Sequence, residues 1–139
     1  MVKVLDMKFI RYSNLFHRVT RISSNHCFEY NNSIIFVVPR NVLSRALGPG
    51  NINLEKLGSV IGKRIKIIPI PSGIEEIENF VSIITRPIRI KAIEVRDNEA
   101  IINTNQQSKA SLIGRDKVRL EEMEKILGQY FNIKKIRIK

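Results

Sequence analysis

Cysteine is nearly absent from this sequence: Cys27 is the only one in 139 residues. A single cysteine cannot form an intramolecular disulfide, so no disulfide framework holds the fold. Together with its neighbour His26, Cys27 gives only two candidate metal ligands, whereas a structural zinc site needs four ligands at defined spacing. We therefore expect Cys27 to be a buried core residue, and we expect no bound metal.

Long hydrophobic runs are also lacking. No apolar stretch approaches the roughly 20 residues that a membrane-spanning helix needs. The first six residues, Met-Val-Lys-Val-Leu-Asp, lack the apolar core of a signal peptide. These absences predict a cytoplasmic protein with no membrane partner.

The usual catalytic signatures do not occur. The sequence has no paired carboxylates in a plausible metal arrangement, no nucleophile with a base, and no glycine-rich nucleotide loop with its lysine. His17 falls on the surface of an expected helix and is not a good candidate for a catalyst. We expect no enzymatic activity and no cofactor.

Acidic residues are scarce relative to basic ones. There are 24 Lys and Arg against 13 Asp and Glu, a net charge of +11. A solvated surface rich in lysine and glutamate would explain many charges but not this excess of one sign, which favours a nucleic-acid partner. Residues 1–70 carry 11 basic and 3 acidic side chains, and residues 71–139 carry 13 and 10. The first half is therefore the better electrostatic candidate.

Hydrophobic periodicity divides the first half into six elements. The β-branched run 34–38 is typical of a central strand, and Asn31-Asn32 is a turn signal before it. Asn41 is expected to cap the helix that follows. The expected elements are a first helix, strands 22–30 and 33–38, helices 41–47 and 52–61, and strand 63–70. The first helix has its apolar face at Leu5, Phe9, Tyr12, Phe16 and Val19.

The second half repeats this order after a short, stiff junction at 69–73. Ser72 and Glu75 form a capping-box signature, Pro87 marks the end of the helix, and Asp97-Asn98 is a turn signal. The expected elements are a helix between that capping box and Pro87, strands 88–95 and 99–104, helices 106–113 and 117–130, and strand 133–138.

An offset of 66 residues relates the two halves, which argues for duplication. Residue pairs at this offset are Gly48 with Gly114, Leu54 with Leu120, Glu55 with Glu121, and Gly62 with Gly128. We expect two modules, 1–70 and 71–139, in a mixed α/β fold. Because a module of this size is only marginally stable alone, we also expect the two to pack on each other.

Each module places a glycine turn between two short helices after its central strand. Glycine allows a close approach of the main chain to a bulky partner. The following helix presents unpaired N–H groups and a positive dipole end to a phosphate, and the adjoining apolar surface can hold bases. This arrangement favours contact with a nucleic-acid backbone.

Residues 46–54, Ala-Leu-Gly-Pro-Gly-Asn-Ile-Asn-Leu, and 112–120, Leu-Ile-Gly-Arg-Asp-Lys-Val-Arg-Leu, resemble the core motif of KH domains. The αββααβ order resembles the type II KH topology. Two such modules in so small a chain are similar to the archaeal NusA-like transcription factors, as are residues 10–16 and the strand with Cys27. The resemblance implies two tandem type II KH domains, each with a three-stranded sheet and helices on one face. It also implies binding of single-stranded RNA in transcription elongation or termination, with RNA polymerase or other transcription factors as further partners.

The resemblance assigns RNA contacts to both loops and their flanks. In the first module these are Arg45, Gly48, Pro49, Gly50, Asn51, Asn53 and Lys56; in the second they are Gly114, Arg115, Lys117 and Arg119.

Both loops depart from the family pattern. The second glycine of the motif falls on Asn51 in the first loop and on Lys117 in the second. Asparagine tolerates left-handed geometry, so the first loop can keep its shape. Positive charge there would come from Arg40, Arg45, Lys56 or Lys63. In the second loop Asp116 either caps the next helix or competes with phosphate for the same amides, and we expect the first module to dominate binding.

Other interpretations stay open at this stage. The tail 134–139 alternates basic and apolar residues, which fits either a strand with a solvated face or an extension of the RNA footprint. The degenerate loops also fit a protein–protein adaptor of KH ancestry. A role with ribosomal RNA, in ribosome assembly or translation, is a third possibility because KH folds serve several functions.

Overall fold

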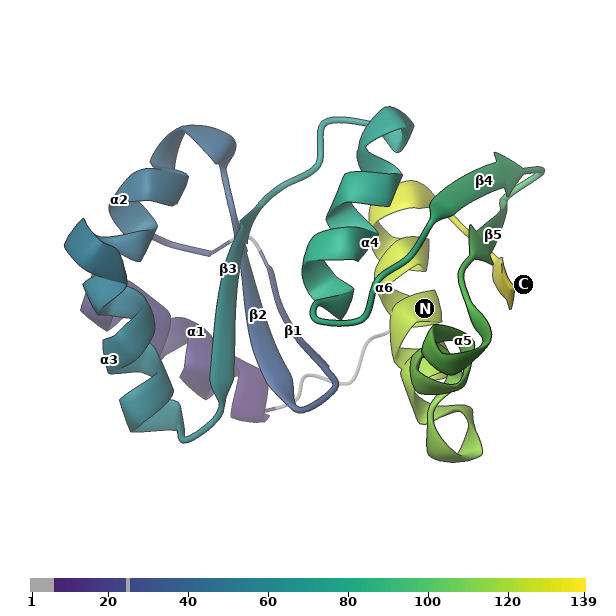
Figure 1. Ribbon diagram of the computed structural model, residues 1–139. Helices are drawn as coiled ribbons and strands as arrows, with labels where there is room; N and C mark the ends of the chain where they lie inside the picture. Colours follow the sequence, from purple (N-terminus) through teal and green to yellow (C-terminus); the bar gives the residue numbers. More distant parts are fainter. Residues whose placement is uncertain (1–6, 25) are drawn as a thin grey trace. The chain divides into compact units, whose positions relative to one another are not determined.

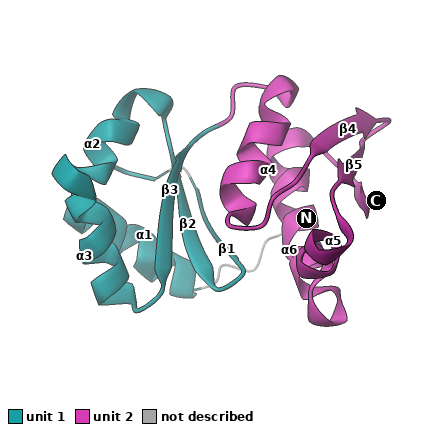
Figure 2. Ribbon diagram, viewed as in Figure 1, with its two compact units in different colours: residues 1–70 teal, residues 71–139 magenta. Residues whose placement is uncertain are grey.

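A computed structural model describes residues 7–24 and 26–139. The chain forms two compact units, residues 1–70 and residues 71–139 (Figure 2). Leu5, expected on the first helix, lies outside the described residues. Within the described part of the chain, no helix is long and apolar enough to cross a bilayer.

The first unit has a three-stranded sheet with its helices on one face (Figure 1). The strand order is β1-β2-β3, with β1 and β2 antiparallel and β2 and β3 parallel. Its elements are α1 Met7–Thr20, β1 His26–Tyr30, β2 Ser33–Val38, α2 Leu43–Leu47, α3 Ile52–Ile61 and β3 Arg64–Pro69.

The second unit repeats this order and sheet topology. Strands β4 and β5 are antiparallel and β5 and β6 are parallel. Its elements are α4 Ile77–Thr85, β4 Ala92–Arg96, β5 Glu99–Asn103, α5 Gln106–Ile113, α6 Val118–Phe131 and β6 Lys135–Ile138. The predicted fold class is confirmed, because αββααβ occurs twice around two three-stranded sheets.

Each unit has a two-residue hairpin turn at the predicted position. Asn31 and Asn32 have φ values of 51° and 61°, and Asp97 and Asn98 have 48° and 66°. Two consecutive left-handed residues match the right-handed twist of the flanking strands, and asparagine and aspartate tolerate this conformation best after glycine. The turn residues therefore fix the register of both hairpins.

The core of the first unit lies between the sheet and its helices. Phe16 of α1 stacks on Phe36 of β2 with ring centroids 4.5 Å apart, and Leu57 of α3 is fully buried beside them. Every residue of β2 is buried, as its continuous apolar sequence predicts. In the second unit Phe80 of α4 packs against Tyr130 of α6 with centroids 5.2 Å apart.

Two predicted helix starts are wrong, for the same physical reason. A 3₁₀ turn, Arg40–Val42, precedes α2, so Asn41 lies inside that turn and Val42 is the N-cap. Another, Ile74–Glu76, precedes α4, and the backbone N–H of Ser72 donates to Glu76 Oε1 at 2.9 Å. The predicted capping box with Glu75 is therefore not formed. Strands β1 and β4 also begin later than predicted, at His26 and Ala92.

We predict that Leu57→Ala lowers the free energy of unfolding by about 2–5 kcal/mol, because it leaves a cavity in a fully buried site. Val60 lies on the same helix but is 60% exposed, and Val60→Ala should change stability by no more than about 0.5 kcal/mol. Urea unfolding followed by circular dichroism measures both. Equal effects of the two substitutions would contradict the core assignment.

Candidate nucleic-acid interface

The first loop turns the chain between α2 and α3 and begins at Gly48. This residue has φ 77° and ψ 168°, a conformation that side-chain-bearing residues rarely adopt. A Cβ here would lie 2.9 Å from Asn53 Nδ2 and 3.0 Å from Ile52 Cγ2. The left-handed backbone therefore favours glycine at this position, and a Cβ would also have to displace the side chains of Asn53 and Ile52.

The rest of this loop is a single tight turn. Gly50 and Asn51 both have φ 59°, and the N–H of Asn51 donates to Gly48 O at 3.1 Å. Asn53 Nδ2 donates to Ala46 O at 3.0 Å, across the turn from α3 to α2. Asn53 was predicted to contact RNA; in the structure its amide holds the two helices together.

The second loop has the same backbone. Gly114 has φ 75°, and a Cβ there would lie 2.7 Å from Arg119 Cγ. Asp116 and Lys117 are left-handed with φ 54° and 63°, and the N–H of Lys117 donates to Gly114 O at 3.2 Å. Arg119 Nη1 lies 3.2 Å from Glu122 Oε1, so this predicted RNA contact forms an ion pair within α6.

Asp116 does not cap α6. The N-cap residue is Lys117, and its side chain makes no capping hydrogen bond. Asp116 is instead exposed at the tip of the loop, at the position that Gly50 takes in the first loop. Asp116 is therefore not the helix cap, and its exposed carboxylate stays available to repel a phosphate, the other role predicted for it.

Some of the predicted cations are exposed, and others form ion pairs with acidic side chains. Arg45 and Lys56 are exposed beside the first loop, as are Arg115 and Lys117 in the second. Lys63, also predicted to supply charge, is bound to Glu29 at 3.2 Å, and Lys8 binds the other oxygen of the same carboxylate at 3.2 Å. Lys63 therefore ties the start of β3 to β1.

These two lysines lower the pKa of Glu29. Partial burial alone would raise the pKa, but the hydrogen bonds and charges of Lys8 and Lys63 outweigh it.

The same region contains Cys27, half-buried against the core cluster, where burial and the charge of Glu29 raise its thiol pKa to about 12. Cys27 was predicted to be a buried core residue; it does pack against the core, but it is only partly buried.

Two apolar residues beside the loops were missed in the sequence. Ile52 and Val118 are the first residues of α3 and α6, and they are 43% and 44% exposed. They are separated by the same 66 positions as the two loops. Each offers an apolar surface next to a glycine turn, and the repeat offset was the signal that could have found them.

Across residues 7–24 and 26–139, no three His, Cys, Asp or Glu side chains gather into a potential metal site. His17 is exposed on α1, as predicted.

Comparisons with known proteins point to one set of relatives. No known family model matches the sequence. The chain is 23% identical over 132 residues to a probable transcription termination protein NusA of Halococcus morrhuae, covering 93% of each chain. It is 24% identical over 143 residues to a protein of the same name from Methanocaldococcus jannaschii, covering 99% of this chain and 76% of the relative.

The fold also has a match among solved structures. The crystal structure of APE1850 gives a TM-score of 0.63 with 23% identity, covering 97% of this chain and 100% of the other. At this identity the likeness supports the fold. The distant sequence similarity to the NusA proteins extends over most of the chain.

We predict that Glu29→Gln destabilises the protein at neutral pH and much less in acid. Because the folded pKa of Glu29 is lowered, its ion pairs add stability above the unfolded pKa, which is about 4.3, and lose it as pH falls through the folded pKa. Urea unfolding of both proteins at pH 7 and pH 3 measures this. A difference that is the same at both pH values would contradict it.

Proposed function

We propose that this protein is a NusA-like factor that binds single-stranded RNA during transcription elongation or termination, with the nascent transcript as its ligand and RNA polymerase as a partner. The observation that carries the proposal is the pair of glycine turns with one backbone geometry. Each lies at the start of a helix and next to an exposed apolar residue. The names of the two relatives support the transcriptional role.

The geometry supports a backbone clamp. With no Cβ at Gly48 or Gly50, a phosphate can approach the main chain of the first loop closely. The positive end of the α3 dipole and the exposed side chains of Arg45 and Lys56 favour the negative charge. Ile52 supplies apolar surface for a base beside that phosphate. A clamp of this kind, in which a glycine loop holds the backbone of about four nucleotides, is how KH domains bind single-stranded RNA.

The first loop should contribute more binding energy than the second. Gly50 adds neither side chain nor charge at the tip, and the space around its missing Cβ is open. In the second loop Asp116 places a carboxylate at that position, where it repels phosphate. Arg115 and Lys117 offset this only in part, because Arg119 is paired with Glu122.

A second candidate function is a protein–protein adaptor. The carboxylate of Asp116 favours it, because a loop built only to hold phosphate gains nothing from a negative charge at its tip. In this alternative the loops keep the KH backbone and present it to another protein.

We predict that Gly50→Asp weakens binding to single-stranded RNA by about 1–3 kcal/mol, through loss of a charge-assisted contact and added repulsion. The substitution should not disturb the fold, because Asp116 already adopts φ 54° and ψ 28° at the equivalent position, close to the 59° and 26° of Gly50. Fluorescence anisotropy with a labelled oligonucleotide measures the affinity.

Gly50→Asn is the matched control, since it adds a side chain of the same size without charge. It should retain most of the affinity. The reciprocal change Asp116→Asn should strengthen binding, because it removes a repulsive charge. If folded Gly50→Asp binds RNA as well as the wild type does, the first loop is not a clamp and the adaptor becomes the better interpretation.

We further predict that crosslinking in cells, followed by identification of the bound RNA and proteins, recovers nascent transcripts together with RNA polymerase. The Gly50→Asp protein, expressed at the same level, should recover less RNA. Recovery of mainly ribosomal RNA would instead assign the protein to ribosome assembly or translation, and recovery of proteins without RNA would favour the adaptor.

A further inference from the structure

The two units end their first helices in the same way. Thr20 closes α1 with its buried hydroxyl donating to Phe16 O at 2.8 Å, and Thr85 closes α4 by donating to Val81 O at 2.9 Å. An exposed arginine follows each threonine, Arg21 in the first unit and Arg86 in the second. The duplication thus places an arginine where each helix turns toward its first strand.

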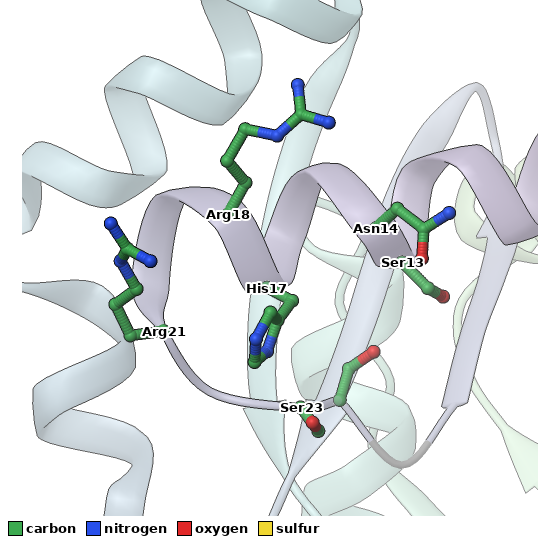
Figure 3. A pocket seen from close by; sticks show the side chains of 7 residues that line it. Ser13, Asn14, His17, Arg18, Arg21 and Ser23 are labelled. Carbon is green, nitrogen blue, oxygen red and sulfur yellow. The ribbon is translucent and has the colours of Figure 1, made fainter.

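A hollow of about 590 Å³ lies at this turn in the first unit (Figure 3). Its seven lining residues are two arginines, one histidine, one asparagine and three serines, with no acidic residue among them. Arg18 and Arg21 extend from the last turn of the helix, and His17 extends toward the segment that carries Ser23. The composition of this hollow matches the donors that bind phosphate.

The second unit has a hollow at the corresponding place, of about 460 Å³. Ser82, Arg86 and Arg89 line it together with apolar residues. Each hollow is therefore lined by two arginines beside the end of the first helix, of which only Arg21 and Arg86 occupy equivalent positions. A cationic character that persists in both copies is not explained by the packing of either unit.

Arg21 also has an unfavourable backbone conformation. Its φ is 63°, and its N–H donates to His17 O at 2.7 Å to close the helix. Glycine or asparagine is preferred at such a left-handed position, and other residues raise the energy. A cation in the last turn does stabilise a helix dipole, which accounts for Arg18. The helix dipole does not account for Arg21, which occupies a left-handed position where glycine would be more stable.

We propose that this hollow at the end of α1 binds a phosphate group of RNA, as a second contact beyond the first loop; this inference rests on the proposed function. Arg18 and Arg21, whose guanidinium groups point to the same side of the helix end (Figure 3), would hold the charge. Ser24, which also lines the hollow, has a buried Oγ with no hydrogen-bond partner among the described residues.

The position of α1 connects the hollow to the loop. The helix packs against both α2 and α3, which flank the first loop. A KH domain holds about four nucleotides, so we expect RNA that only fills the loop to leave the hollow empty. The additional contact is therefore expected to raise the affinity only for longer RNA. This dependence on RNA length distinguishes binding at the hollow from binding at the loop.

The test compares the affinities of the full-length protein for a uridine tetranucleotide and for a 12-mer of uridine. Arg21→Gly should weaken binding of the 12-mer about fivefold and leave the tetranucleotide unchanged, while thermal stability stays the same or rises because the left-handed strain is relieved. Arg18→Gln should weaken the 12-mer similarly. Lys125→Ala, which removes one exposed positive charge from α6, is the control and should have no such effect.

Two 12-mers, with a 5′-hydroxyl or a 5′-phosphate, identify the source of the phosphate. Equal losses with both assign an internal backbone phosphate, and a loss with only the 5′-phosphate assigns the RNA end; either result supports the proposal. Suppose that Arg21→Gly lowers the affinity for the 12-mer no more than Lys125→Ala does, while Gly50→Asp lowers the affinity for both RNAs. This result would overturn the proposed phosphate site in the hollow and leave the proposed clamp at the first loop intact. A wild-type protein that binds neither RNA overturns both.

Discussion

The structure depends on the exclusion of a Cβ at the first residue of each loop. At Gly48 and Gly114 the second helix comes so close that its own side chain occupies the space a Cβ would need. That contact lets α3 and α6 start directly after a reversal of the chain. The start of each helix is therefore presented at a fixed place beside the sheet. A larger residue would strain the left-handed backbone and displace the side chain of Asn53 or Arg119, which would disturb the surface on which the proposed phosphate contact depends.

Duplication preserved this constraint and changed the chemistry around it. Asn53 and Arg119 are equivalent residues, and each lies against its loop glycine. Asn53 bonds across the turn to Ala46 O, whereas the guanidinium of Arg119 bonds to Glu122. The tips differ as well, with Gly50 in one copy and Asp116 in the other at nearly the same φ and ψ. The backbone geometry is thus compatible with opposite charge preferences, so the fold alone does not make both loops equal phosphate sites.

Elements marked by glycine, by Asn-Asn or Asp-Asn turns, or by β-branched runs could be predicted closely. Strand β2 and helix α3 have the predicted bounds because their signals are local. The helix starts expected at Asn41 and Ser72 could not be predicted correctly. The 3₁₀ turns that displace these caps depend on tertiary packing. The loops of the candidate site were found through their repeat. The hollow at the end of α1 was not, since its residues lie on a helix end and an irregular segment without periodicity.

The distribution of acidic groups explains why the first unit is the better place for a polyanion. Among its described residues only Glu29 and Glu55 are acidic. Glu29 is held between two lysines, so its charge is neutralised locally and projects little field. Glu55 lies in the first turn of α3, where the helix dipole already favours a negative charge. Most of the remaining side-chain charge is positive and exposed. The same few ion pairs that stabilise this unit therefore leave a positive field over the loop and the hollow, which attracts RNA before any specific contact forms.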